Sequence, residues 1–190
     1  MARNPKKFYS LEEYFEIEKN SDIKHEYVYG EIFAISGASA NHNRIVSAVG
    51  VQLYQQLLDS SYESFISKMR TRTHNQIYKY PDVVVACEPR FITINGLESL
   101  TNPVLLVEVL SHSTANFDQE GKFREYQQIE SLRYYLIVAQ NEVLAVLFTK
   151  QEDNTWSSQT FNSLDDFIDL SVINCRLSLQ RTYLRVRVQE

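Results

Sequence analysis

Two acidic residues, Asp82 and Glu108, each adjoin a run of apolar residues long enough to form a buried strand. An ionised carboxylate that is buried without a partner costs several kcal/mol, so each acid requires a cation, a proton or a strong hydrogen-bond donor nearby. A lysine, Lys122, follows in the next expected element. Two acids on neighbouring strands, together with this lysine, predict a divalent-metal site for phosphodiester chemistry.

The elements that must position these residues follow from the spacing of apolar side chains. The chain has 190 residues and is 44% hydrophobic, so we expect one core and a single domain over residues 1–190. The pattern predicts a short helix beginning at Ser10, a hairpin over 26–35, helices over 45–58 and 117–130, and strands over 65–73, 77–87, 103–110, 133–139 and 143–149. This order indicates an α/β (α+β) fold with a mixed β-sheet flanked by helices and an N-terminal helix and hairpin.

The overall charge limits how the chain could bind nucleic acid. A net charge of -5 and a pI near 5.4 argue against a general coat protein, because phosphate binding needs clustered cations. A local groove is still compatible with this charge, since Lys68, Arg70 and Arg72 are spaced by two within a segment that contains no acid. A strand there would project all three from one face to hold a nucleic-acid backbone. The alternative is an exposed edge strand that its charges keep soluble.

Several other classes of protein find no support in the sequence. There is no glycine-rich phosphate loop, no nucleophile elbow and no zinc spacing, and Cys87 and Cys175 are expected to be reduced thiols. The basic start has no apolar segment behind it, and the apolar region 134–148 is interrupted and too short for a membrane helix. We therefore expect a cytoplasmic protein with no membrane partner. Its expected assembly is a homodimer.

Three segments resemble a known family. Pro81-Asp82, the residues Val-Glu-Val-Leu-Ser over 107–111, and Ser-Leu-Arg-Tyr-Tyr-Leu over 131–136 are similar to the Uma-two family of predicted endonucleases. That family is a branch of the PD-(D/E)XK, or restriction-endonuclease-like, superfamily, and the resemblance covers residues 10–150. It implies a restriction-endonuclease-like fold and a Mg²⁺-dependent endonuclease, for which Mn²⁺ can substitute, with DNA as the expected nucleic acid. By this resemblance Asp82 and Glu108 are the metal-binding acids.

One position departs from the superfamily pattern. The usual lysine lies two residues after the second acid, where this chain has Leu110. The resemblance implies that the lysine comes instead from the following helix, at Lys122. The alternative is that Lys122 pairs with Asp118 on an exposed helix face, an arrangement worth only about 0.3–0.5 kcal/mol.

Two further residues have open roles. Glu31 resembles an acid of the family and would support a metal-bound water or the lysine, although it could equally be a solvent-facing strand acid. His42, at the start of the long helix, either orients a group of the site or caps the first turn. The displaced lysine also leaves a second function open, a catalytically silent nuclease-fold protein that binds nucleic acid or a protein partner.

Overall fold

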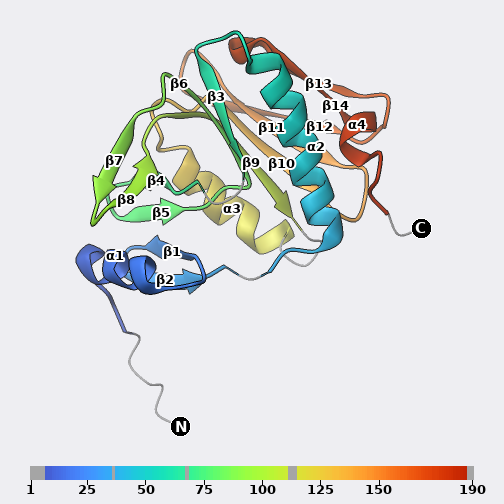
Figure 1. The fold of residues 1–190 in the computed structure, drawn as a ribbon. Helices are drawn as coiled ribbons and strands as arrows, with labels where there is room; N and C mark the ends of the chain where they lie inside the picture. Colours follow the sequence, from blue (N-terminus) through green and yellow to red (C-terminus); the bar gives the residue numbers. More distant parts are fainter. Residues whose placement is uncertain (1–6, 36, 67–68, 111–114, 188–190) are drawn as a thin grey trace.

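The computed structural model describes residues 7–35, 37–66, 69–110 and 115–187, without the side chains of 115–120 (Figure 1). Lys68 and the side chain of Asp118, both named above, therefore lie outside the described residues. The helices are α1 (Leu11–Asn20), α2 (Ala40–Leu57), α3 (Ala115–Tyr126) and α4 (Leu179–Tyr183), with a 3₁₀ turn η1 (Ser171–Ile173).

The strands form three sheets. The first has the order β2 (Glu31–Ala34), β1 (His25–Val28), β5 (Ile77–Lys79), β4 (Thr71–His74), β8 (Leu97–Leu100) and β7 (Phe91–Ile94). The second has the order β12 (Trp156–Phe161), β11 (Ala145–Lys150), β10 (Tyr134–Ala139), β9 (Pro103–Leu110), β6 (Val83–Cys87) and β3 (Tyr62–Ile66). The third pairs β13 (Phe167–Leu170) with β14 (Cys175–Ser178). The expected mixed α/β class is confirmed.

The second sheet forms the centre of the molecule, with β9 parallel to β10 and antiparallel to β6. Alternate residues of β9 enter different cores, because side chains of a strand point to opposite faces. Val107 and Val109 pack in the cluster that contains α2 and α4, whereas Leu106 and Leu110 pack in the cluster that contains α3. The sheet is therefore covered on both faces, as its continuous apolar strands predicted.

The chain crosses from one sheet to the other where the sequence predicted continuous strands. The predicted strand 65–73 is divided between β3 and β4, and the predicted strand 77–87 is divided between β5 and β6. Pro81 has no N–H to donate to a strand ladder, which explains the second break. The single predicted sheet was therefore wrong, and Asp82 lies at the junction between two sheets, just before β6.

The N-terminal helix packs on the first sheet through aromatic side chains. Ser10 and Glu13 form the expected capping box at the start of α1. Tyr14 and Phe15 of α1 are fully buried against Tyr27 and Tyr78 of the sheet, with ring centroids of the helix and the sheet 5.0–5.9 Å apart. These contacts fix α1 and the β1–β2 hairpin to the strand β5 that leads to Asp82.

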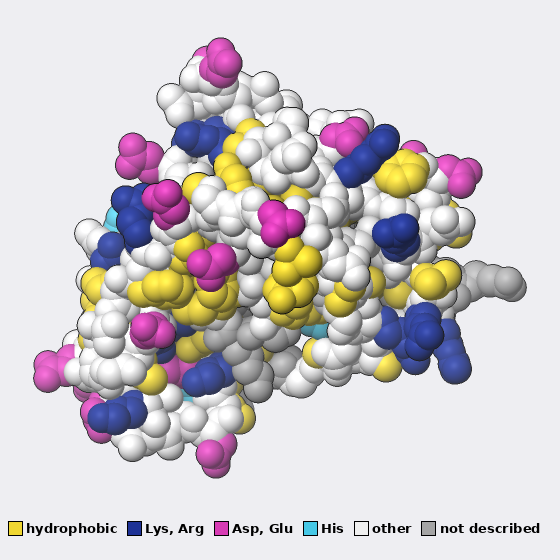
Figure 2. Space-filling model, turned by 45° about the horizontal axis from the view of Figure 1, so that its top comes forward, with side chains coloured by type: hydrophobic (Ala, Val, Ile, Leu, Met, Phe, Trp, Pro, Cys, Tyr) yellow, Lys and Arg dark blue, Asp and Glu magenta, His cyan; other side chains and the backbone are white. Residues whose placement is uncertain are grey.

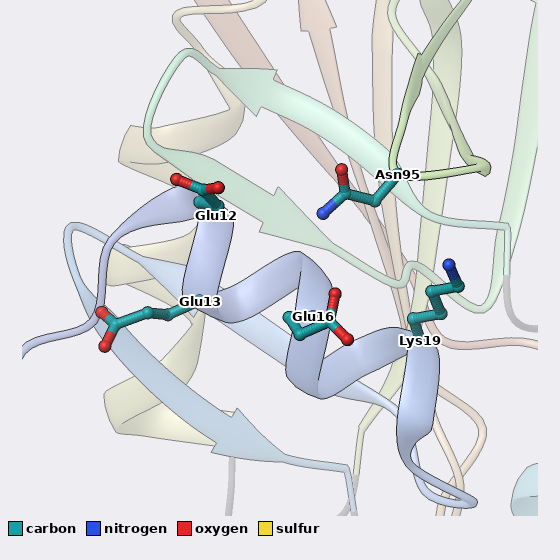
Figure 3. Close-up of a pocket in the computed structure, with 5 residues that line it drawn as sticks. All are labelled: Glu12, Glu13, Glu16, Lys19 and Asn95. Carbon is teal, nitrogen blue, oxygen red and sulfur yellow. The ribbon is translucent and has the colours of Figure 1, made fainter.

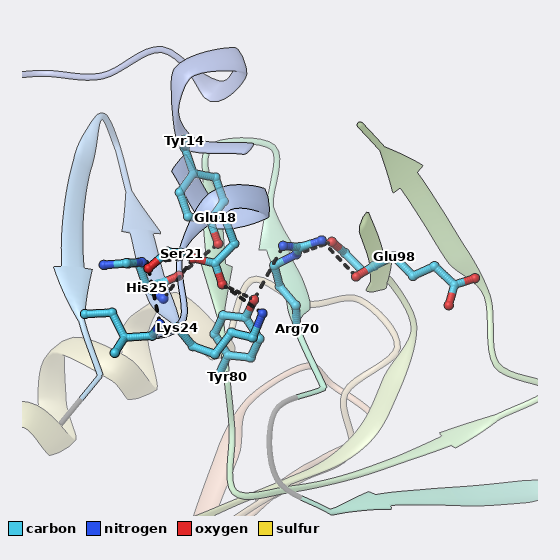
Figure 4. Close-up of polar contacts among 10 residues, drawn as sticks. Tyr14, Glu18, Ser21, Lys24, His25, Arg70, Tyr80 and Glu98 are labelled. Atoms are coloured by element: carbon cyan, nitrogen blue, oxygen red, sulfur yellow. Dashed lines mark hydrogen bonds and ion pairs between the residues drawn. The ribbon is translucent and has the colours of Figure 1, made fainter. Parts of the chain in front are cut away.

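A buried carboxylate joins α1 to the same segment (Figure 4). Glu18 accepts a hydrogen bond of 2.6 Å from the Tyr80 hydroxyl and two of 3.0 Å from the backbone N–H and the ring Nδ1 of His25. Lys24 Nζ lies 3.7 Å from the same carboxylate. Tyr80 is two residues before Asp82, so this network anchors the chain at the point where it changes sheet.

Arg70 belongs to this network and not to a surface stripe. It precedes β4, is only 4% exposed, and donates to Ser99 Oγ at 2.8 Å and to the Glu98 carbonyl at 3.0 Å. Its guanidinium also donates to the Tyr80 hydroxyl and lies 4.7 Å from the centre of the Phe15 ring. The prediction that Arg70 binds nucleic acid was therefore wrong, because its donors are used inside the protein.

No helix among the described residues has the length and apolar character needed to cross a membrane.

The helix α3 ends earlier than the sequence predicted, since it stops at Tyr126 and the chain continues in turns. Phe123, Tyr126 and Ile129 pack in the cluster beneath α3.

The buried position of Arg70 predicts a loss of stability when it is replaced. Arg70→Gln should lower the free energy of unfolding by about 1.5–3 kcal/mol, because it removes hydrogen bonds from a charged donor and leaves buried acceptors unpaired. Arg185→Gln, at an exposed position, is the matched control and should change stability by less than about 0.5 kcal/mol. Urea unfolding measures both variants, and equal stability of the two would contradict this role for Arg70.

Candidate active site

The pairing of β6 with β9 brings the two predicted acids together. Val83 lies opposite Val107 in antiparallel register, and the Asp82 N–H donates to the Val107 carbonyl at 3.1 Å. The N–H of Val109 in turn donates to Asp82 Oδ2 at 2.8 Å. The Asp82 carboxylate, immediately before β6, is thus held against the neighbouring strand β9 beside Glu108.

Glu108 is buried in the centre of the sheet, with 5% of its surface exposed. Its Oε1 accepts a hydrogen bond of 2.7 Å from the Tyr126 hydroxyl, and its Oε2 lies 3.2 Å from Lys122 Nζ. Burial raises the pKa of Glu108, and the charge of Asp82 adds to the rise, while Lys122 and Tyr126 oppose it. The site therefore carries more negative charge than its burial favours.

The ammonium group comes from a helix and not from the strand that carries the acid. Lys122 belongs to α3, and its Nζ contacts Glu108 Oε2. The strand position of the usual lysine is Leu110, which is buried in the cluster beneath α3. The structure thus brings Lys122 to the acid pair, as predicted, and an apolar residue packs where the superfamily lysine would otherwise lie.

His42 contacts Asp82. Its Nε2 is 3.1 Å from Asp82 Oδ1 and 3.2 Å from Oδ2, and the hydrogen bond to Asp82 raises the pKa of His42 despite its partial burial. The cap of α2 is Ser39, whose Oγ accepts the His42 N–H, so the histidine side chain is free of that role. Within the described part of the chain, its Nδ1 is buried without a hydrogen-bond partner.

The sequence reasoning missed a buried lysine that ties α3 to the first sheet. Lys79 of β5 is 5% exposed and lies 3.4 Å from Glu26 Oε2 of β1 and 2.9 Å from Glu125 Oε2 of α3. Glu125 is three residues after Lys122. The sequence did contain a clue to this burial, because Lys79 ends a strand whose other residues are apolar. Glu108 was identified by the same kind of pattern, a charged residue within an apolar strand.

Glu31 lies in β2, opposite Val28 of β1, and is half-buried. Directly opposed residues and residues two apart share a face of a sheet, so Glu31 and Glu26 lie on the same face, away from α1. The carboxylate of this hairpin that raises the pKa of Glu108 is Glu26. A catalytic role for Glu31 stays a prediction.

Two other surface features do not coincide with the acid pair. A cavity of about 450 Å³ is lined by Lys19 and Asn95 and by three acids of α1, Glu12, Glu13 and Glu16 (Figure 3). Its lining shares no residue with the site around Glu108. On the face in Figure 2, basic and acidic side chains are interspersed rather than gathered into one charged surface.

The acid pair suits a hard cation with an open coordination sphere. In the described ranges no three His, Cys, Asp or Glu residues converge on one point. Mg²⁺ typically binds through one or two carboxylates and keeps several waters. The partly exposed Asp82 beside the buried, charge-disfavoured Glu108 fits such an ion.

Comparisons with known proteins identify the family and the fold. The family model Uma2, described as "Putative restriction endonuclease", matches residues 11–182. Two Synechocystis proteins, "Uncharacterized protein sll1609" and "Uncharacterized protein slr1290", are 40% and 36% identical over 79% and 82% of this chain and 85% and 82% of their own lengths. A crystal structure described as a putative nuclease belonging to DUF820 from Anabaena variabilis superposes with a TM-score of 0.74 at 16% identity, over 92% of this chain and 97% of that one.

Because burial disfavours the charge of Glu108, replacing this residue by a neutral one should stabilise the protein. In the absence of metal, Glu108→Gln should raise the melting temperature at neutral pH, because the amide keeps a hydrogen-bond acceptor and removes a charge that burial disfavours. A carboxyl whose pKa is raised on folding destabilises the protein most above its folded-state pKa, so the gain should shrink as the pH falls through that raised pKa and should be lost below the unfolded value of about 4.3. Thermal unfolding at several pH values in EDTA measures this, and a lower melting temperature for Glu108→Gln at pH 7 would contradict it.

Proposed function

Since the chain belongs to the Uma2 family, we propose that it is a Mg²⁺-dependent endonuclease that hydrolyses phosphodiester bonds of nucleic acid, with DNA as the expected substrate. The observation that carries the proposal is the buried Glu108 carboxylate, with an ammonium 3.2 Å away and a second acid on the neighbouring strand. A protein that only binds nucleic acid has no need of this arrangement, since burying charges is costly.

Asp82 and Glu108 are the residues that would hold the ion. When bound, Mg²⁺ would polarise a phosphate oxygen and lower the pKa of a coordinated water. The protein holds Asp82 in place through the Val109 N–H and His42, and it holds Glu108 through Tyr126. These hydrogen bonds preorganise both carboxylates before substrate arrives.

Lys122 would act on the charge that develops during hydrolysis. A water oxygen forms a bond to phosphorus, the bond between phosphorus and the leaving oxygen breaks, and a proton ends on that leaving oxygen. The Lys122 ammonium lies beside the acid pair, where it can hydrogen-bond a phosphate oxygen and offset the added negative charge of the transition state. A helix can supply this group as well as a strand can, because the chemistry depends on the position of the nitrogen.

His42 and Tyr126 are positioning residues in this proposal. His42 fixes the orientation of Asp82, and the Tyr126 hydroxyl occupies one oxygen of Glu108 and leaves the other toward Lys122. Of the three basic residues predicted to hold the nucleic-acid backbone, Arg72 is the described one that we still propose for this role. It lies in β4 opposite Tyr78 and is half-buried, so its contribution would be a single phosphate contact.

The acid pair should be required for both metal binding and cleavage. Asp82→Asn and Glu108→Gln should each abolish Mg²⁺-dependent cleavage of nucleic acid and weaken Mn²⁺ binding in calorimetry, because each removes one of two carboxylate ligands. Glu12→Gln, at an exposed acid of α1, is the control and should change neither. Parental cleavage by either site variant under the same metal would remove that acid from the proposal. Tight Mn²⁺ binding without cleavage of single-stranded, duplex or branched DNA and RNA would instead favour the silent, nucleic-acid-binding alternative.

Lys122 should act on turnover more than on binding. Lys122→Ala should lower kcat by about 10²–10³, as is typical when one preorganised electrostatic donor is lost, with little change in KM. Leu110→Lys in the Lys122→Ala background should recover part of the activity, because residue 110 shares the strand face of Glu108. The recovery is expected to be partial, since a lysine must replace a packed leucine. Asp118→Ala should leave kcat unchanged. Similar small losses of stability in Asp118→Ala and Lys122→Ala, with kcat unchanged in both, would support the ion-pair alternative.

A further inference from the structure

One side of α2 presents large apolar side chains to solvent. The opposite side of the helix is buried in the core through Ile45, Val49 and Leu53. The outer side carries Val51, Tyr54 and Leu58, which are 51%, 57% and 60% exposed. They are spaced by three and four, so they lie along one line of the helix and its last turn. The helix lies at the front of Figure 1, and the related view in Figure 2 shows hydrophobic side chains at the surface.

The surface beside this line is uncharged. The segment from Ile45 to Leu58 contains no charged residue, and its other exposed positions are Ser47, Gln55 and Gln56. Surface helices of soluble proteins ordinarily carry charges on their outer side. Interfaces, by contrast, are depleted of charge at their centres and enriched in residues such as tyrosine. This outer side of α2 therefore has the composition of an interface centre.

The apolar surface continues onto the neighbouring strand. β3 is at the end of the strand order of the second sheet, and its Ile66 is 43% exposed. Ile66 lies over Gly50, where a larger residue of α2 would collide with it. The α2 face, defined here as Val51, Tyr54, Leu58 and Ile66, is therefore one contiguous surface formed by a helix and an edge strand, in contrast to isolated apolar residues that need no explanation.

We propose that a second copy of this chain packs on the α2 face, with the two α2 helices antiparallel about a twofold axis near Val51. The charges at the two ends of the helix carry the choice of partner and of direction. Arg44 is half-buried in the second turn, on the line that leads to Val51, and donates to Asn41 Oδ1. The exposed Asp59 follows Leu58 at the other end. In an antiparallel pair, Arg44 of each copy lies beside Asp59 of the other, whereas a parallel pair would place like charges together.

A twofold axis perpendicular to the two helices generates this antiparallel pair, in which each copy offers the same surface to the other. The helix dipoles of the pair then oppose and attract one another. The face is small, because it consists of part of one helix and the end of one strand. We therefore expect a dimer at the weak end of specific association, with a Kd on the order of micromolar.

The proposed interface leaves the two acid sites accessible. His42, which contacts Asp82, is in the first turn of α2, while the apolar line occupies its second half. In the antiparallel pair the two sites would thus lie at opposite ends of the paired helices. Loss of the dimer should leave Mn²⁺ binding by one chain intact, so failure of this proposal and failure of the proposed function give different results.

The test is the mass of the purified full-length chain in solution. Sedimentation equilibrium from about 1 to 100 µM should show the parental protein passing from monomer to dimer, in the range expected for a micromolar Kd. Tyr54→Lys combined with Leu58→Lys should give a monomer throughout, with an unchanged circular dichroism spectrum. Leu184→Lys, at another exposed apolar residue, is the matched control and should still dimerise. A parental monomer at every concentration, or a dimer that the α2 variant does not disrupt, would overturn the proposal.

A charge exchange tests the direction of the pair. Arg44→Glu should weaken the dimer at least tenfold, because the substitution would place a carboxylate, in place of the guanidinium, beside Asp59 of the other copy. Adding Asp59→Arg should restore the affinity, since the exchanged charges again attract. Failure of the second substitution to restore the dimer would overturn the antiparallel arrangement.

Discussion

The burial of one carboxylate, that of Glu108, sets the requirements that the surrounding structure meets. A strand in the middle of a sheet that helices cover on both faces has no water to solvate a charge, so the neighbours of Glu108 must do so. Tyr126 and Lys122 approach from α3, and Asp82 approaches from β6 with its own charge held by His42 and the β9 backbone. Each main structural layer thus contributes a group to one small polar region within an otherwise apolar interior.

The same requirement explains why α3 must dock accurately. Lys79 is placed between Glu26 of the first sheet and Glu125 of α3, so a second buried set of charges holds the helix that carries Lys122 and Tyr126. The Glu18 network plays a comparable part for the strand before Asp82, through Tyr80. The first sheet and α1 therefore support the acid pair from outside, although they contribute no side chain that touches Glu108 among its described hydrogen bonds and ion pairs.

The sequence allowed some of these features to be predicted and concealed others for physical reasons. The acid in the continuous apolar run of β9 was conspicuous, because the period of two assigns Glu108 to a face shared with Leu106 and Leu110. The change of sheet at Pro81 was not, since the residues on both sides favour strands. Arg70 was assigned to the surface on its charge and spacing, yet its burial depends on Ser99, Glu98 and Tyr80, which are distant in sequence. Lys79 and Glu26 were missed because they meet only when β1 pairs with β5, and Glu125 joins them only when α3 packs beside that sheet.

The position of the Lys122 ammonium on a helix has a consequence for how the site is assembled during folding. A lysine two residues beyond the second acid would accompany that acid as soon as β9 formed. Here Asp82 and Glu108 can meet once β6 pairs with β9, but Lys122 arrives only when α3 has packed over the finished sheet. A chain in which β6 and β9 had paired without α3 would hold two acids without their cation, so the complete site requires the packing of α3. The site is thereby coupled to the completion of folding, which ties competence for chemistry to the integrity of the whole central sheet.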